Sequence, residues 1–234
     1  MRYTRLPNES ADYLARREDL GVAELELMRQ QEQVAKMRRN LPPGPPVKDY
    51  VFQEGPADLD AGDRPARHVR LSELFSGPDR PLFIYHFMYG KKQTSACPMC
   101  TMWIDGFNGV AQHLRQNMDF AIVAAADLPT LRAHGRDRGW QNLRLLSAGD
   151  SSFKYDFKSE DEEGNQDSTV SVFTRDPDGG VRHFYTTRPS MAEDVHERGI
   201  DLLTPVWSML DLTPEGRGEW YPELAYPTPS KVTA

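Results

Sequence analysis

Two cysteines, Cys97 and Cys100, are the only ones in the 234-residue chain, and they stand in a Cys-Pro-Met-Cys segment. A thiolate attacks disulfides and other electrophiles. The segment follows a predicted buried strand and opens a predicted helix, which is the setting of thiol redox motifs. A helix N-terminus favours a thiolate, and one helical turn brings the two sulfurs within disulfide reach. We therefore expect Cys97 to be the exposed nucleophile and Cys100 the buried resolving thiol.

The same two sulfur atoms are also candidates for a metal site. Copper(I) and zinc(II) both bind thiolates, and His86, at the end of the predicted strand before the cysteines, is a candidate third ligand. The thioether of Met99 between the cysteines suits a soft metal. Two other interpretations stay open. His86 could be a half-buried strand histidine hydrogen-bonded to the backbone, and the cysteine pair could be inert.

A second candidate region is the Phe-Lys-Tyr-Asp-Phe segment at 153–157. Its polar pair, Tyr155 and Asp156, stands between phenylalanines and is our candidate for lining a substrate pocket. The alternative is packing with a hydrogen-bonded hydroxyl group. The acidic run at 159–168 lacks the spaced ligands of a calcium loop, so we expect a solvated surface loop there.

Charge and hydropathy argue against several classes of function. The chain has 28 basic and 35 acidic residues and a formal net charge of −7, without the basic stripe that nucleic acids or anionic membranes require. Its longest apolar runs, 82–88 and 120–126, are much shorter than a bilayer span, and its charged N-terminus is unlike a signal peptide. We therefore expect a cytoplasmic protein whose partner is a small-molecule substrate or a thiol reductant.

The N-terminal part of the chain predicts one long helix over residues 10–41. This segment has no proline, Ser10 is a candidate N-cap, and leucine or valine recurs at 20, 27, 34 and 41. The apolar seam suits either docking on the chain's own domain or a homodimer contact between two such helices. The proline-rich spacer that follows ends the helix. We expect 1–46 to be a helical extension with its spacer, 47–220 the main domain and 221–234 an irregular tail.

Apolar periodicity and turn residues predict an α/β domain after the spacer. Strands and helices alternate after residue 81, which implies parallel β–α–β units in a central mixed sheet flanked by helices. The proline and glycines at 176–180 predict a tight hairpin. The predicted strands are 49–53, 68–70, 81–88, 119–126, 143–147, 170–175 and 181–187. The predicted helices are 97–116, 128–140 and 191–212, with a helical turn at 71–75, and the last helix is interrupted or kinked near Pro205.

The remaining signal is a set of motifs spread along the chain. They are Tyr85-His86-Phe87-Met88, Cys97-Pro98-x-Cys100 with Trp103 and Asp105-Gly106-Phe107, Phe153-Lys154-Tyr155-Asp156-Phe157, Arg198-Gly199-x-Asp201, and Asp211-Leu212-Thr213-Pro214-x-Gly216-Arg217. Together these motifs resemble the thioredoxin-like proteins catalogued as domain of unknown function 899, over about residues 6–220. The resemblance implies a thioredoxin-like fold with a helical N-terminal extension. It also implies a redox-type site at Cys97 and Cys100, without a particular substrate.

The chain departs from thioredoxins in the region expected to face the cysteines. Thioredoxins place a cis-proline before the strand that faces the cysteines, whereas Ser168-Thr169 stands there in this chain. This departure weakens the prediction of a general disulfide reductase. Thr94 lies three residues before Cys97, as in peroxiredoxins, but Gly90 replaces the proline of that motif.

The sequence as a whole favours a thioredoxin-like oxidoreductase with no certain cofactor. In this hypothesis Cys97 attacks a disulfide, a peroxide or another electrophile, and Cys100 resolves the product as an intramolecular disulfide. The alternative is a copper-dependent oxidoreductase or a copper-binding protein, with the metal held by Cys97, Cys100 and His86, acting in specialised metabolism.

Overall fold

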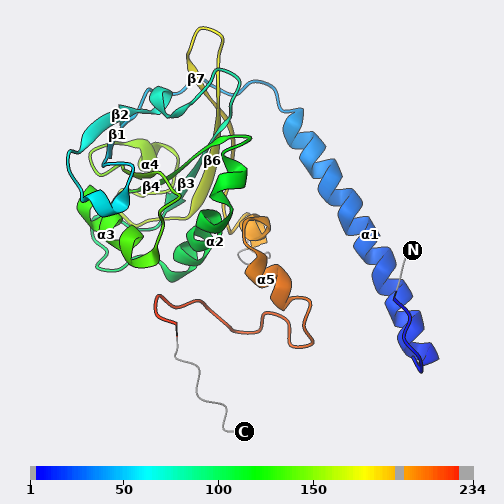
Figure 1. Cartoon of the computed structure of the whole chain (residues 1–234). Helices are drawn as coiled ribbons and strands as arrows, with labels where there is room; N and C mark the ends of the chain where they lie inside the picture. Colours follow the sequence, from blue (N-terminus) through cyan, green and yellow to red (C-terminus); the bar gives the residue numbers. More distant parts are fainter. Residues whose placement is uncertain (1–3, 193–197, 227–234) are drawn as a thin grey trace. The chain divides into compact units, whose positions relative to one another are not determined.

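The computed structural model describes residues 4–192 and 198–226 of the chain (Figure 1). The chain forms two compact units, Met1–Pro43 and Gly44–Ala234. No helix within the described ranges is both long enough and apolar enough to span a bilayer.

The first unit contains one long helix, α1, over Ala11–Arg39. It begins where the Ser10 hydroxyl accepts a hydrogen bond from the Tyr13 N–H at 3.1 Å, so the predicted N-cap is confirmed. Basic side chains in its last turn complement the negative end of the helix dipole. Docking or dimerisation through the apolar seam stays a prediction.

The second unit is built on a mixed seven-stranded sheet with the order β2-β1-β5-β4-β3-β6-β7. The three central strands, β5, β4 and β3, are parallel to one another, and every other neighbouring pair is antiparallel. This is the predicted combination of β–α–β units with a hairpin. The strands are β1 Val51–Glu54, β2 Arg67–Arg70, β3 Leu82–Phe87, β4 Asp119–Ala124, β5 Leu145–Ser147, β6 Thr169–Arg175 and β7 Val181–Thr187.

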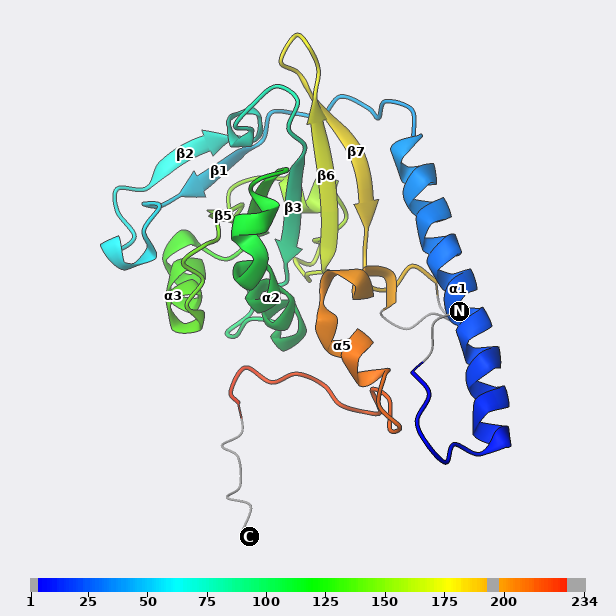
Figure 2. The same ribbon diagram turned by 45° about the vertical axis from the view of Figure 1, so that its right-hand side comes forward.

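Helices connect and cover these strands. Two of them, α2 and α3, confirm the predicted helices that follow β3 and β4, and they lie on the same face of the sheet (Figure 2). The one-turn helix α4 and the short η1 are absent from the sequence prediction, because neither is long enough to show a helical repeat. The helices are α2 Pro98–Leu114, α3 Leu128–Arg138, α4 Phe153–Asp156 and α5 Pro205–Leu210, with 3-10 helices η1 Leu59–Ala61, η2 Leu71–Leu74 and η3 Arg198–Leu203.

The predicted interruption of the 191–212 helix near Pro205 is confirmed in the described part of that segment. Residues 193–197 lie outside the described residues, and beyond them η3 and α5 are separate helices. Thr204 between them is extended, and its hydroxyl accepts a hydrogen bond from the Val206 N–H at 3.4 Å. The break falls there because Pro205 has no N–H to continue a helix and disfavours helical backbone in the residue before it.

The sheet separates two apolar cores, because successive side chains of a strand point to opposite faces. On the face that we call the α2 face, Tyr85 and Phe87 of β3 pack with Trp103 and Phe107 of α2. On the other face, the α4 face, Ile84 of β3 belongs to the core that contains α4. The alternation along β3 therefore decides which of its side chains can reach the first turn of α2.

We expect the packing of α2 on the sheet to be a main source of stability. Phe107 is 4% exposed and its ring lies 5.4 Å from that of Tyr85. Phe107→Ala should lower the free energy of unfolding by about 3–5 kcal/mol, because it leaves a cavity between helix and sheet. Val110→Ala, on the exposed side of the same helix, should change it by less than about 0.5 kcal/mol. Urea denaturation of both variants checks this, and equal effects would contradict the packing argument.

Candidate active site

The two cysteines lie at the first turn of α2, next to the end of β3. Cys97 is the N-cap of α2, with extended backbone, and its N–H donates to the Met88 carbonyl at 3.2 Å. Pro98 occupies the first helical position, where no backbone donor is needed. The Cys100 N–H then donates to the Cys97 sulfur at 3.4 Å. The sequence spacing and the cap geometry thus bring both side chains into one turn.

The two cysteines differ in their exposure to solvent. Both residues are thiols in this structure; Cys97 is partly exposed, whereas Cys100 is completely buried. Burial raises the pKa of the Cys100 thiol well above its usual value, and a hydrogen bond with Cys97 adds to that shift. Hydrogen bonds from Tyr85 and from the Met88 backbone act in the opposite direction.

A pair of buried hydroxyl groups lies behind Cys100. Tyr85 is fully buried, and its hydroxyl lies 2.8 Å from the Ser168 hydroxyl and within hydrogen-bonding distance of the Cys100 sulfur. Burial raises the pKa of Tyr85 well above its usual value, so this group stays a hydroxyl and can donate to sulfur. Ser168 is the residue that stands in the region of the thioredoxin proline, and the sequence alone did not indicate its contact with Tyr85.

A buried lysine also interacts with Cys100. Lys154 of α4 is 1% exposed, and its ammonium donates to the Phe87 carbonyl at 2.9 Å. Burial lowers the pKa of Lys154 to about 8, against the attraction of Cys100, Glu160 and Asp167. The lysine is absent from our predicted site, although it lies within the 153–157 segment. The only sequence signal for it is a lysine in the middle of an aromatic segment.

His134 contacts Thr101 in the first turn of α2. The Thr101 hydroxyl donates to the Cys97 carbonyl at 3.0 Å and lies 3.2 Å from Nε2 of His134. Because that hydroxyl has one hydrogen, donation to the carbonyl is compatible with the tautomer of His134 that has its proton on Nε2. Burial lowers the pKa of His134, so the ring is neutral near pH 7.

His86 does not lie with the cysteines, contrary to the predicted third metal ligand. Its ring nitrogens lie 2.8 Å from the Ser159 hydroxyl and 3.0 Å from the Ser171 hydroxyl, and its ring stacks on Phe153 of the α4 face. The reason is the alternation along β3, which turns His86 to the sheet face opposite that of Tyr85. In residues 4–192 and 198–226, no three His, Cys, Asp or Glu side chains are grouped so that they could hold a metal ion.

Tyr155 and Asp156 make surface contacts on the α4 face, and their role in a substrate pocket stays a prediction. Tyr155 is 37% exposed, and its hydroxyl donates to Glu162 at 3.4 Å. Asp156 accepts hydrogen bonds from Lys48 at 2.9 Å and from Tyr50 at 2.8 Å, which tie α4 to the segment around β1. The pair therefore belongs to the surface of the α4 face.

Comparison with solved structures identifies the fold. The chain is similar to the *Plasmodium falciparum* antioxidant protein, a 1-Cys peroxiredoxin, with 12% identity over 68% of this chain and 88% of that one and a TM-score of 0.50. It is also similar to reduced Prx3 from *Vibrio vulnificus* (16% identity; 70% and 94% covered; TM-score 0.47). A third is a putative thioredoxin reductase from *Burkholderia cenocepacia* (16% identity; 70% and 96% covered; TM-score 0.48).

At these identities the likeness concerns the fold alone, and the predicted thioredoxin-like fold is confirmed. No curated protein matches the sequence. The family described as "Bacterial protein of unknown function (DUF899)" matches residues 3–230, which is nearly the whole chain. The motifs around the cysteines and in the 153–157 segment had indicated this same family. The chain belongs to the DUF899 family of bacterial proteins of unknown function.

Proposed function

We propose that this protein is a dithiol oxidoreductase in which Cys97 is the nucleophile and Cys100 the resolving thiol. The observation that carries the proposal is the first turn of α2. There the sulfur of the partly exposed Cys97 accepts the Cys100 N–H at 3.4 Å, and the buried Cys100 sulfur lies within hydrogen-bonding distance of Cys97. One sulfur can meet a substrate, and the other can reach only its neighbour.

The reaction proceeds in two displacements. The Cys97 thiolate attacks an electrophilic sulfur or oxygen atom, and the leaving group departs with the bonding electron pair. The Cys100 thiolate then attacks the Cys97 sulfur, forms the disulfide and releases the rest of the substrate as a thiolate or as water. Two electrons pass from the dithiol to the substrate, and a thiol reductant returns them. Such reductants are abundant in the cytoplasm, which stays our predicted location.

The second displacement requires a thiolate at a buried sulfur. The raised pKa of Cys100 opposes this thiolate, whereas hydrogen bonds from Tyr85 and from the Met88 backbone favour it. The Tyr85 hydroxyl donates to the Cys100 sulfur. The positive charge of Lys154 also attracts the Cys100 thiolate, because charges interact strongly in the buried interior. We assign Lys154 the role of a positioning residue that stabilises the Cys100 thiolate.

The two cysteine variants should behave differently. With 2-hydroxyethyl disulfide, Cys97→Ser should abolish the release of thiol, because the accessible nucleophile is lost. Cys100→Ser should release one thiol and keep the other half of the reagent bound to Cys97, because nothing resolves it. Intact-protein mass spectrometry distinguishes the bound adduct from an internal disulfide. Unchanged turnover in Cys97→Ser would rule out the proposed nucleophile.

The metal content of the purified protein distinguishes the proposed dithiol mechanism from a copper-dependent one. His86 is hydrogen-bonded to Ser159 and Ser171 on the other face of the sheet. Of the three predicted ligands, a copper ion at this site would therefore have only the thiolates of Cys97 and Cys100. Plasma mass spectrometry on protein purified without added metal should find no stoichiometric copper. About one copper per chain that disappears in Cys97→Ser would overturn the proposal in favour of a copper protein.

Lys154→Met should slow the second displacement by about tenfold or more near neutral pH, because losing the cation raises the pKa of Cys100 and lowers the fraction of thiolate. Because the thiolate is the reacting form, a higher thiol pKa shifts the increase in rate to higher pH. The resolution rate of the variant should therefore approach that of the wild type in alkaline solution. Rapid quenching of the Cys97 adduct across pH 6–10 measures this step.

Lys158→Met is the matched control for this experiment, since Lys158 is exposed on the same segment. It should leave the resolution rate and its pH profile unchanged. Alkylation of Cys97 should change little in Lys154→Met. A pH profile identical to that of the wild-type protein would exclude the proposed role of Lys154.

A further inference from the structure

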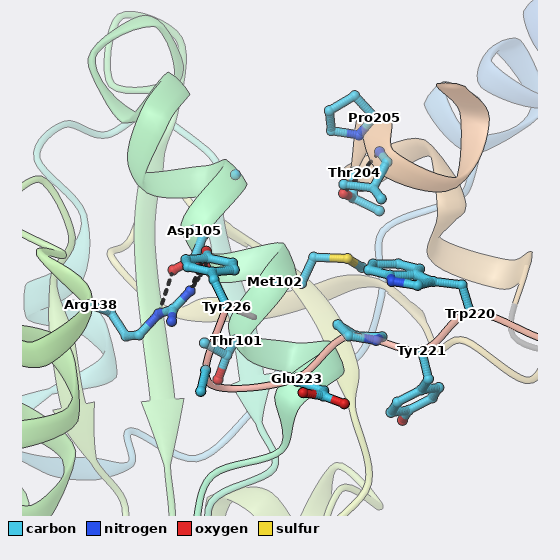
Figure 3. Close-up of a pocket in the computed structure, with 14 residues that line it drawn as sticks. Thr101, Met102, Asp105, Arg138, Thr204, Pro205, Trp220, Tyr221, Glu223 and Tyr226 are labelled. Atoms are coloured by element: carbon cyan, nitrogen blue, oxygen red, sulfur yellow. Dashed lines mark hydrogen bonds and ion pairs between the residues drawn. The ribbon is translucent and has the colours of Figure 1, made fainter. Parts of the chain in front are cut away.

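A cavity of about 600 Å³ lies beside α2 (Figure 3). Its walls come from α2, from residues 204–206 at the start of α5, and from residues 220–226, which we call the strap. The strap has no helix or strand, and its chain crosses in front of α2 in Figure 3. A volume of this size is typical of sites for small molecules.

Arg138, at the end of α3, holds the strap in place. Its guanidinium donates to the Leu224 carbonyl at 2.9 Å and to the Tyr226 hydroxyl at 2.6 Å, and it lies over the Tyr226 ring. The same guanidinium pairs with Asp105 of α2, whose carboxylate also accepts the Trp140 indole N–H at 2.8 Å. The strap is thus a wall fixed by hydrogen bonds to two helices.

The chemistry of the lining favours an uncharged aromatic ligand. The charges of Asp105 and Arg138 compensate each other, and Glu223, the remaining charged side chain of the lining, is exposed to solvent. Between these groups lie aromatic and thioether surfaces. Trp220 is 49% exposed and faces the side chain of Met102 in Figure 3. An aromatic ring would cover this apolar surface and stack on the indole.

The cavity is connected to the cysteines through one helix face. Cys97, Thr101 and Asp105 are four residues apart, so they follow one another along α2. Thr101 lines the cavity, and its hydroxyl donates to the Cys97 carbonyl at 3.0 Å. The cavity therefore begins one helical turn from the nucleophile.

We propose that this cavity binds the aromatic part of the electrophile that Cys97 attacks, an inference that rests on the proposed dithiol function. For an aromatic disulfide, the Cys97 thiolate bonds to one sulfur, and the other sulfur leaves as an aromatic thiolate. Cys100 then displaces the second aromatic thiolate and forms the internal disulfide. Two electrons pass from the dithiol to one disulfide, so the step needs no further reactant.

Gly106 offers a way to fill the cavity without disturbing the core. It lines the cavity, and apart from its chain neighbours and the adjacent backbone of α2, no atom lies within 4 Å of the place where its Cβ would be. In Gly106→Phe a ring can enter the cavity, and the substitution removes a glycine from a helix interior. Gly109→Phe is the control, because Gly109 is an exposed position of the same helix with equally open space and lies outside the cavity.

The test measures binding without redox chemistry. The probe is 4,4′-bipyridine, an uncharged aromatic molecule that resembles 4,4′-dithiodipyridine and cannot be reduced by thiols. Calorimetry on the full chain should find one site with the same affinity in the wild type and in Gly109→Phe. Gly106→Phe should weaken it by about tenfold or more, because the new ring occupies the ligand volume. No binding to the wild type, or equal binding to both variants, overturns the proposal.

A second measurement connects the cavity with the nucleophile. Saturating bipyridine should slow the alkylation of Cys97 by iodoacetamide in the wild-type protein, because the ligand lies one helical turn away. Binding without this protection would also overturn the proposal, since the cavity would then be separate from the cysteines. Neither bipyridine binding nor Cys97 alkylation requires the cysteines to form a disulfide. Failure of the proposed dithiol function would therefore appear in the 2-hydroxyethyl disulfide assay and not in these two measurements.

Discussion

The candidate site depends on two backbone carbonyls at the end of β3. The Phe87 carbonyl accepts the Lys154 ammonium at 2.9 Å, and the next carbonyl, that of Met88, accepts the Cys97 N–H at 3.2 Å. These contacts attach α4 and the cap of α2 to the same point of the sheet, although the two donors are far apart in the sequence. The Met88 backbone also reaches the Cys100 sulfur. A rigid strand end therefore sets the position of both thiols and of the buried cation.

A buried lysine is an unfavourable way to stabilise a fold. Its pKa falls from 10.5 to about 8, which corresponds to roughly 3 kcal/mol of lost stability at neutral pH. Between those two values the unfolded chain binds more protons than the folded chain, so this cost decreases as the pH rises, whereas below about 8 it is complete. An apolar side chain in the place of Lys154 would avoid the cost. The contribution of Lys154 is thus better explained by the charge it brings near Cys100 than by stability.

The sequence predicted most of the fold, but it did not indicate which side chains surround the two cysteines, and the difference has a physical reason. The strand at 82–87, the helix after it and the hairpin carry strong local patterns, and all three are confirmed. His86 was misplaced because a strand with apolar residues at nearly every position does not reveal which face the next helix will cover. Lys154 was missed because α4 is a single turn, in which no periodicity marks the inward side chain. Both errors concern tertiary placement rather than local structure.

Ser168 explains why the region before β6 differs from that of thioredoxins. The Tyr85 hydroxyl is completely buried and needs a partner other than the Cys100 sulfur, and the Ser168 hydroxyl provides it at 2.8 Å. A proline at residue 168 has no polar side-chain atom, so it would leave the tyrosine hydroxyl short of one hydrogen bond in the core. The serine and the tyrosine therefore form a unit. Their chemical effect is to direct a donor at the Cys100 sulfur, which a site with proline at residue 168 and phenylalanine at residue 85 could not do.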